Sequence, residues 1–356
     1  MPTRKPLWNI REIMAAPQTT AQFAAKKPLE TGDIAPAFKL AAASGETIDP
    51  ASDLVAGKPL LLLFRVGDAL PQGLEALVGR LKATDGRAVL ATALGETPSG
   101  EKGGLDGFES AADSEGAARG LFSVGDETRL VLIAPNRHVA YIGGDVAAAE
   151  TALARIAATR AAVTMTTHPP ILIVPDVFSR ADCQKLINIF AMQGQTFVEP
   201  GHGTLPPGNA DYKQRIPEYG RKDRIDHWIR QPETNAFIDD RLNRRLIPEI
   251  QKSFQYKITR REVYRIGCYE GERGGELHGH RDNTKAVVAH RRFACSINLN
   301  TEQFEGGELR FPEFGNQLYR PETGAAITFS CSLLHEPMHV TKGKRFVLLS
   351  FLYGET

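Results

Sequence analysis

Runs of consecutive apolar residues in the first half of the chain predict buried β-strands. Three such runs stand out, namely PLLLLFRV (59–66), RAVLATAL (87–94) and RLVLIAPNRHVAYIGG (129–144). The third run is interrupted by Pro135 and Asn136, which favour a turn. We therefore expect two single strands followed by a β-hairpin.

Two further segments show the spacing or composition of helices. Between the first two runs apolar residues recur at helical spacing, at Leu74, Leu77, Val78 and Leu81. An alanine-rich stretch from Val146 to about Val163 predicts a closing helix. After a polar arm of residues 1–26, this order indicates a small α/β sandwich over residues 27–165.

The pattern changes at THPPILIVPDVF (167–178), where three prolines break the periodicity. We expect a domain boundary near residue 165 and a second domain over residues 166–356. Ser179 and Asp182 predict a capping box at the start of a helix. A second helix, which Pro248 is expected to kink, has an apolar face made of Phe237, Ile238, Leu242, Leu246 and Ile250.

From Glu262 onward the pattern is one of short strands and turns. The strand-like segments are REVYRIGCY, RFACSINLN, GELRFP, GAAITFS, MHVTK and RFVLLSFLY. Such a run, preceded by helices, predicts a double-stranded β-helix, or jelly-roll, barrel. The expected fold class is α+β with two domains.

The overall charge of the chain adds little to this picture. Its 356 residues contain 43 Lys and Arg against 42 Asp and Glu, so no basic field would attract nucleic acid or an anionic membrane. No stretch approaches the ~20 apolar residues of a membrane span, and the first residues contain no continuous apolar segment. We expect a soluble, cytoplasmic protein without nucleic-acid or membrane partners.

The four cysteines are widely spaced and all lie in the second half of the chain. Their spacing fits neither a zinc knuckle nor a disulfide framework. Reduced and mostly buried thiols are therefore expected at Cys183, Cys268, Cys295 and Cys331.

The segment GGELHGHRDNTK (274–285) contains candidate metal ligands. Alternate residues of a strand share a face, so His280 and Asp282 point the same way, with His278 one step further back. His-x-Asp pairs are common by chance, and the pair needs a third ligand from elsewhere in the chain. Downstream, His290, His335 and His339 are available, and we interpret His290 as an exposed loop residue.

Two histidines and one carboxylate on one face of a metal form the facial triad of non-haem iron(II) oxygenases. Three protein ligands leave three coordination positions for a chelating 2-oxo acid and O₂. The far carboxylate of that co-substrate requires a cation, ideally the planar fork of an arginine. Arg345 lies ten residues after His335 on the following predicted strand and is placed to supply it.

From about Pro170 to the end, the chain resembles prolyl-4-hydroxylase-type 2-oxoglutarate and iron(II)-dependent dioxygenases. The resemblance rests on the ordered motifs CYEGERGGELHGHRDN, RRFACSINLN, FEGGELRFPEFG, RPETGAAITFS and HEPMHVTKGKR. It implies Fe(II) as cofactor, 2-oxoglutarate and O₂ as co-substrates, and L-ascorbate as a further cofactor to be expected. The substrate it implies is a prolyl or other residue of a protein or peptide, or a free amino acid.

Carried over by position, the resemblance implies iron ligands at His280, Asp282 and His335. It also implies that Arg345 binds the 2-oxoglutarate carboxylate and that Tyr269 places a hydroxyl near the co-substrate. These five residues, together with Asn298 as a co-substrate contact, are the predicted site: His280, Asp282, His335, Arg345, Tyr269 and Asn298.

The chain departs from the family pattern at two positions. His339 stands where the family often has proline, which makes it a rival for the distal ligand, but it would shorten the gap to Arg345 from ten residues to six. Asn298 stands where hypoxia-type prolyl hydroxylases have tyrosine. Other roles also stay open: His278 as a turn residue or substrate contact, Tyr269 as a core tyrosine and Asp282 as a turn former.

LETGDIAPAFKLAAASGETIDPASDLVAGKPLLLLFRV (29–66) resembles the opening of peroxiredoxins of the thioredoxin fold. Peroxiredoxins carry a reactive thiolate at the start of the helix after the strand. The corresponding stretch here, GDALPQGLEAL, has no cysteine, and none occurs before Cys183. The resemblance therefore implies a redox-silent scaffold, a protein partner or homo-oligomer contact, and no peroxidase activity.

Two functions from different classes follow from the sequence. The first is a hydroxylase that decarboxylates 2-oxoglutarate to succinate while it hydroxylates an unactivated C–H bond. The second is a non-catalytic sensor or interaction protein that binds iron and 2-oxoglutarate without turnover. Succinate release that depends on a substrate would distinguish them.

Overall fold

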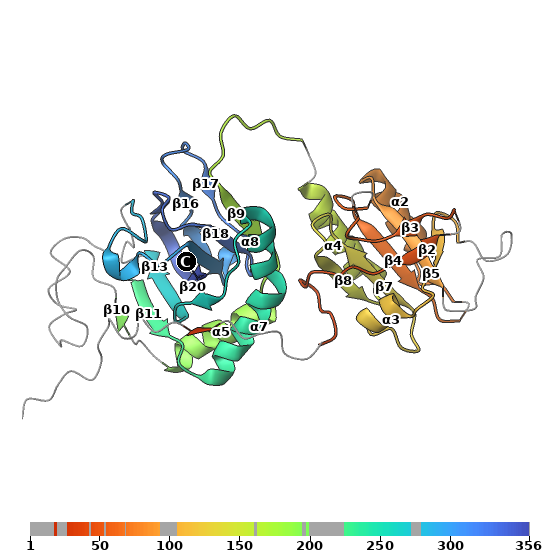
Figure 1. Cartoon of the computed structure of the whole chain (residues 1–356), viewed down its shortest axis with the longest axis horizontal. Helices are drawn as coiled ribbons and strands as arrows, with labels where there is room; N and C mark the ends of the chain where they lie inside the picture. The colour runs from red at the N-terminus through yellow and green to blue at the C-terminus, as the bar shows by residue number, and fades with distance from the viewer. Residues whose placement is uncertain are drawn as a thin grey trace, which may run out of the picture. The chain divides into compact units, whose positions relative to one another are not determined.

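The chain forms two compact units, Ala25–Thr164 and Met165–Thr356 (Figure 1). The structure, a computed structural model, describes residues 18–19, 27–42, 44–52, 55–67, 69–92, 105–159, 162–193, 197–198, 224–271 and 279–355. The predicted N-terminal arm, residues 1–26, lies outside these ranges except for residues 18–19.

The unit Ala25–Thr164 is built on one mixed sheet in the order β3-β2-β6-β5-β4-β7-β8. Its strands are β2 (Leu40–Ala42), β3 (Thr47–Ile48), β4 (Leu60–Phe64), β5 (Arg87–Thr92), β6 (Glu109–Ala112), β7 (Arg129–Ile133) and β8 (Val139–Gly143). β4 pairs in parallel with β5, and β5 with β6, whereas β4 and β8 both pair antiparallel with β7. The strands predicted from the long apolar runs are confirmed. The short strands β2, β3 and β6 carry too little apolar pattern to be recognised in the sequence.

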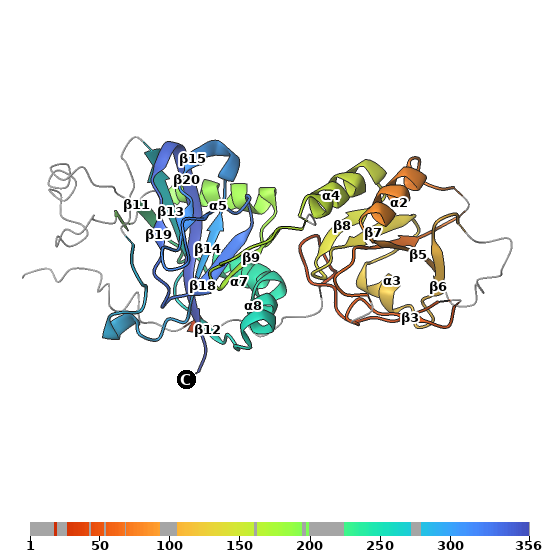
Figure 2. The ribbon, with the colours of Figure 1, turned by 90° about the horizontal axis from the view of Figure 1, so that it is seen from above.

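Helices cover both faces of this sheet (Figure 2). α2 (Leu74–Ala83) and α4 (Val146–Ala158) pack on one face, and α3 (Ala117–Leu121) packs on the other. α4 ends before the predicted Val163. Its last fully buried residue is Leu153, and Val163 is 77% exposed, so a longer helix would bury no further apolar surface.

The unit that ends at Thr356 contains two antiparallel sheets. The large sheet follows the order β10-β11-β13-β20-β14-β18-β9, with β1, β12 and β15 attached beside this path. Its members are β1 (Gln18–Thr19), β9 (Ile171–Val174), β10 (Phe197–Val198), β11 (Arg224–Trp228), β12 (Arg260–Arg261), β13 (Arg265–Glu270), β14 (Phe293–Asn298), β15 (Phe304–Gly306), β18 (Ala326–Ser330) and β20 (Val340–Tyr353). The small sheet has the order β17-β16-β19, formed by β16 (Leu309–Arg310), β17 (Leu318–Tyr319) and β19 (Glu336–Pro337). Two antiparallel sheets of this kind are consistent with the predicted jelly-roll.

Helices cover the outer face of the large sheet, as Figures 1 and 2 both show. Within the described residues these are α5 (Arg180–Gln193), α7 (Pro232–Arg245) and α8 (Ile247–Phe254), and the 3₁₀ turns η3 (Ala286–Val288) and η4 (Thr301–Gln303) lie in the loops. The apolar core between helices and sheet includes Leu186, Ile238, Ile250, Ile266, Ile297 and Leu348. This layer fixes the outer face of β13, β14 and β20, so their other face is left to form the interior of the barrel.

The prediction of one helix kinked at Pro248 is wrong. The chain forms two helices, and Leu246 is both the C-cap of α7 and the N-cap of α8. Pro248 stands in the first turn of α8, where its missing N–H is not needed by the helix. A proline therefore starts a second helix here instead of bending the first.

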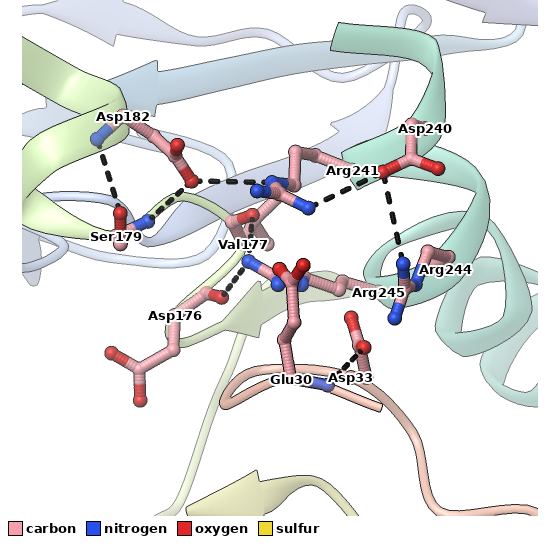
Figure 3. Close-up of polar contacts among 10 residues, drawn as sticks. All are labelled: Glu30, Asp33, Asp176, Val177, Ser179, Asp182, Asp240, Arg241, Arg244 and Arg245. Atoms are coloured by element: carbon pink, nitrogen blue, oxygen red, sulfur yellow. Dashed lines mark hydrogen bonds and ion pairs between the residues drawn. The ribbon is translucent and has the colours of Figure 1, made fainter. Parts of the chain in front are cut away.

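The predicted capping box is confirmed at the start of α5 (Figure 3). The Ser179 amide donates to Asp182 Oδ2 at 3.2 Å, and the Asp182 amide donates to Ser179 Oγ at 3.0 Å. Arg241 of α7 donates through Nε to the same Asp182 oxygen at 3.2 Å. Arg245 of α7 donates to the Val177 carbonyl at 3.1 Å. The start of α5 is thereby fixed to α7.

None of the helices within the described ranges combines the length and the apolar composition needed to cross a bilayer.

Candidate metal centre

The inner face of the large sheet lines a cavity of about 70 Å³. Alternate residues of β13, β14, β18 and β20 point toward it, because a strand presents every second side chain to the same side. The lining includes Tyr269, Ser296, Phe329, Arg345 and Phe351, together with three potential metal ligands. Polar groups thus gather in an otherwise apolar barrel interior.

The three potential ligands are His280, Asp282 and His335, the set predicted from the sequence. One donor atom from each lies within 4.8 Å of the others. Among the described residues, these three form the cluster of side chains that could hold a metal ion. Nε2 of His280 is 3.6 Å from Asp282 Oδ1, and Nε2 of His335 is 3.5 Å from Asp282 Oδ2. Both imidazoles therefore face one carboxylate.

Main-chain hydrogen bonds hold these residues in place. His280 and His335 form an isolated antiparallel bridge, in which each amide donates to the other's carbonyl at 2.9 and 3.0 Å. The Asp282 amide donates to the Cys331 carbonyl at 2.9 Å, just past the end of β18. Residues far apart in the sequence are thus joined by the closure of the barrel.

The protonation states suit metal binding. Burial lowers the pKa of His335 more strongly than the neighbouring Asp282 raises it, so the imidazole is neutral at pH 7. Burial alone would raise the pKa of Asp282, but its hydrogen bond to His280 and the nearby His335 bring it below its ordinary value. His335 Nδ1 lies 3.1 Å from the Leu333 carbonyl, which fixes Nδ1 as the donor and leaves the Nε2 lone pair for a metal.

The other histidines considered in the sequence lie elsewhere. His339 is outside the group of three, directly before β20. His290 lies in a turn, as expected, but it is half-buried and not exposed, because its Nε2 is 3.0 Å from Glu262 and its ring packs on Tyr353. Both partners are distant in the sequence, so the local pattern could not reveal them. His278 lies outside the described residues.

Arg345 lies on β20 with its guanidinium in the cavity, and it is 4% exposed. Its Nε and Nη2 donate to Asn298 Oδ1 at 3.2 and 3.0 Å, and Asn298 Nδ2 donates to the Pro321 carbonyl at 3.0 Å. Tyr269 is the cross-strand neighbour of Arg345, and the guanidinium carbon is 5.3 Å from its ring centre. Asn298 therefore orients Arg345, which gives this departure from the family pattern a structural role.

Close packing explains the two glycines of the turn at residues 306–308, here called the GGE turn. Gly306 and Gly307 have φ values of 75° and 71°. A Cβ on Gly306 would lie 2.1 Å from the His339 carbonyl oxygen, and one on Gly307 would lie 3.0 Å from Arg345 Cδ. The turn thus lies directly against the strand that presents Arg345.

Sequence reasoning missed one charged residue of the cavity, Arg265 on β13. It shares the inner face with Tyr269 and lies 3.8 Å from the fully buried Asp226. The sequence does contain a sign of this residue's role, since an arginine interrupts the otherwise apolar strand YRIGCY at an inward position. The pairing with Asp226 requires β11, which the sequence pattern did not reveal.

The cysteines contribute no reactive group. All four are buried thiols, as predicted. Burial raises the pKa of Cys183 and Cys295 to about 12 and also raises that of Cys331. Thiols of this kind stay protonated and behave as small apolar core residues.

Comparison with known proteins bears on the half of the chain that holds this site. Two PKHD-type hydroxylases, from Synechococcus sp. strains JA-2-3B'a(2-13) and JA-3-3Ab, are each 27% identical over 188 residues, which is 51% of this chain and 77% of each relative. No family model matches the chain.

Among solved structures, a viral collagen prolyl hydroxylase from Paramecium Bursaria Chlorella virus-1 aligns with a TM-score of 0.38 and 16% identity, over 52% of this chain and 96% of that one. A Pseudomonas putida prolyl-4-hydroxylase gives 0.39 and 16%, over 54% and 95%. A 2OG-Fe(II) oxygenase family oxidoreductase from Burkholderia pseudomallei gives 0.39 and 15%, over 52% and 85%.

The sequence relatives support a relationship between the C-terminal half of the chain and PKHD-type hydroxylases, and the prediction that the protein is an enzyme is confirmed. The thioredoxin-like assignment of residues 27–165 stays a prediction.

Proposed function

We propose that this relative of the PKHD-type hydroxylases is a 2-oxoglutarate- and Fe(II)-dependent dioxygenase that hydroxylates an unactivated C–H bond. The observation that carries the proposal is the position of His280, Asp282 and His335 in one cavity with the buried guanidinium of Arg345. Two imidazole nitrogens and one carboxylate are the donor set that suits Fe(II) and leaves coordination positions open. The substrate class we propose is a prolyl or other residue of a peptide or protein, or a free amino acid.

Each side chain has a definite task in this proposal. Arg345, held by Asn298, binds the distal carboxylate of 2-oxoglutarate through two N–H groups, and Tyr269 lies beside that contact. Phe329 and Phe351 keep water from the reacting atoms. Iron, when bound, lets O₂ convert 2-oxoglutarate to succinate and CO₂ while the second oxygen atom becomes the hydroxyl group of the product.

The metal ligands can be tested by alanine substitution. His280→Ala, Asp282→Ala and His335→Ala are each expected to abolish succinate formation and to lower the iron content, because one of three protein donors is lost. His339→Ala is the matched control and is expected to keep measurable activity. Loss of iron with His339→Ala, combined with normal iron binding by His335→Ala, would contradict the assignment.

Detection of a hydroxylated product would exclude the non-catalytic sensor. Candidate peptides and amino acids are incubated with the enzyme, Fe(II), 2-oxoglutarate and ascorbate, and mass spectrometry is used to find a gain of one oxygen. Hydroxylation with equal release of succinate is the expected result. Tight binding of iron and 2-oxoglutarate without any succinate would favour the sensor.

For residues 27–165 we propose a thioredoxin-like scaffold that contributes recognition or self-association. Its β4-α2-β5 unit, the β7-β8 hairpin and the closing helix α4 support this proposal. The chain has no cysteine before Cys183, so the unit has no thiol for peroxide reduction. Hydroperoxide turnover by residues 1–165 alone would count against the proposal.

A further inference from the structure

One buried arginine contacts both the main chain of a proposed metal ligand and the wall of the cavity. Arg291 follows η3 and is 6% exposed. Its Nη1 donates to the main-chain carbonyl of Asp282 at 3.3 Å. Its guanidinium carbon also lies 3.6 Å from the ring centre of Phe351, which lines the cavity.

Glu262, itself 4% exposed, fixes this guanidinium from the opposite side. Arg291 Nε and Nη2 donate to the two carboxylate oxygens of Glu262 at 2.6 and 2.8 Å, in a bidentate pair. His290 Nε2 is 3.0 Å from Glu262 Oε1 as well. The main chain of Glu262 forms two hydrogen bonds with β20. Its amide donates to the Phe351 carbonyl, and its carbonyl accepts from Ser350 Oγ. The pair is therefore anchored to the C-terminal end of β20.

We propose that Arg291, clamped by Glu262, is a positioning residue that holds Asp282 and Phe351 in the arrangement that metal binding requires. The inference rests on the proposed function, because it concerns the same metal centre. Asp282 is held at both of its main-chain polar groups, by Cys331 at the amide and by Arg291 at the carbonyl. A carboxylate so fixed keeps its distance to the two imidazoles without a rearrangement on binding.

The geometry requires arginine at this position. A planar guanidinium can bind a carboxylate with two N–H groups, donate a third to a carbonyl and lie flat on an aromatic ring at the same time. The ammonium group of lysine keeps the charge opposite Glu262 but cannot make all of these contacts. Arg291→Lys therefore removes the hold on Asp282 without leaving a buried carboxylate unpaired.

The test is titration of metal-free protein with Mn²⁺, a redox-stable probe of the Fe(II) site, by calorimetry. We expect Arg291→Lys to weaken Mn²⁺ binding by about 10- to 100-fold, the usual effect of losing a group that orients a metal ligand. Arg292→Lys is the matched control. That neighbouring side chain is half-buried and donates to the Ala289 carbonyl, so metal affinity should stay within about twofold of the wild type.

A second variant separates positioning from general stability. Arg261 is also a buried arginine in a bidentate pair, with Asp239, and its Nη1 donates to the Glu262 carbonyl at 3.2 Å, but it makes no contact with Asp282 among the described residues. Arg261→Lys should lower Tm yet leave the Mn²⁺ affinity unchanged. If Arg291→Lys lowers Tm in the same way and binds Mn²⁺ as the wild type does, the inference is overturned. If instead the wild type and Asp282→Ala bind Mn²⁺ equally, the proposed metal centre itself is wrong.

Discussion

Single side chains determine how the co-substrate is recognised. The guanidinium of Arg345 is buried, and Asn298 Oδ1 fixes its orientation by accepting from Nε and Nη2. In the proposed function, affinity for 2-oxoglutarate therefore depends on the planar shape of this cation as well as on its charge.

Arg345→Lys is accordingly expected to raise the 2-oxoglutarate concentration needed for half-maximal succinate formation by about tenfold or more, because the bidentate contact is lost while the charge remains. Arg345→Ala should raise it further, and iron content should change little in either variant. Arg310→Lys, which alters a half-exposed ion pair with Glu336, is the control. Equal 2-oxoglutarate dependence in all of these proteins would remove Arg345 from the site.

His335 links the metal centre to pH. Its pKa is lowered by burial in the folded protein, whereas the unfolded chain has the ordinary value of 6.5. As the pH falls below that value, the unfolded state takes up a proton that the folded state resists, and the free energy of unfolding decreases. The lowered pKa of Asp282 affects the free energy of unfolding only at pH values near and below its ordinary value of 3.8, which lie below the range in which His335 titrates.

Urea unfolding of metal-free protein at pH 7.5 and pH 5.5 checks this expectation. The wild type should be less stable at the lower pH, and His335→Asn should reduce the difference between the two. His339→Gln should leave it unaltered. A stability difference that survives in His335→Asn would assign the effect to another group.

At the scale of elements, the sequence predicted what local patterns can encode. The capping box at Ser179 and Asp182 and the strands around Leu60–Phe64 and Arg87–Thr92 were recognised because their signals are contiguous. The Glu262–Arg291 pair was not predicted, since it depends on which strands become neighbours. The family resemblance was needed to predict the three ligands as one set, because periodicity alone did not distinguish His335 from His339.

The GGE turn is an element whose rigidity serves Arg345. Gly306→Ala places a methyl group 2.1 Å from the His339 carbonyl oxygen in a backbone conformation that alanine disfavours, so the start of β20 must shift. We expect a lower Tm and a higher 2-oxoglutarate concentration for half-maximal succinate formation. Gly116→Ala has a similar φ of 65° with open space around the added methyl group, and it should reproduce only the cost of the backbone strain. Normal 2-oxoglutarate dependence of Gly306→Ala would show that the turn does not support the site.

At the scale of the whole molecule, the two units have separate apolar cores. We expect each core to unfold by itself and, from the metal-ligand groups of the described residues, the unit that contains His280, Asp282 and His335 to gain stability from a metal. Calorimetric scans of the full chain should show two transitions, and Mn²⁺ should raise the temperature of one. Asp282→Ala should abolish that increase. An equal increase in both transitions would indicate that the units unfold together.

The bridge between His280 and His335 has a consequence for amide hydrogen exchange. The two amide protons are each buried in a hydrogen bond to the opposite histidine, and both bonds break when this part of the barrel opens. Their exchange rates with deuterated water therefore report how often the barrel opens at the metal centre. A bound metal should slow both amides by the same factor, which gives a readout of occupancy that needs neither a substrate nor turnover.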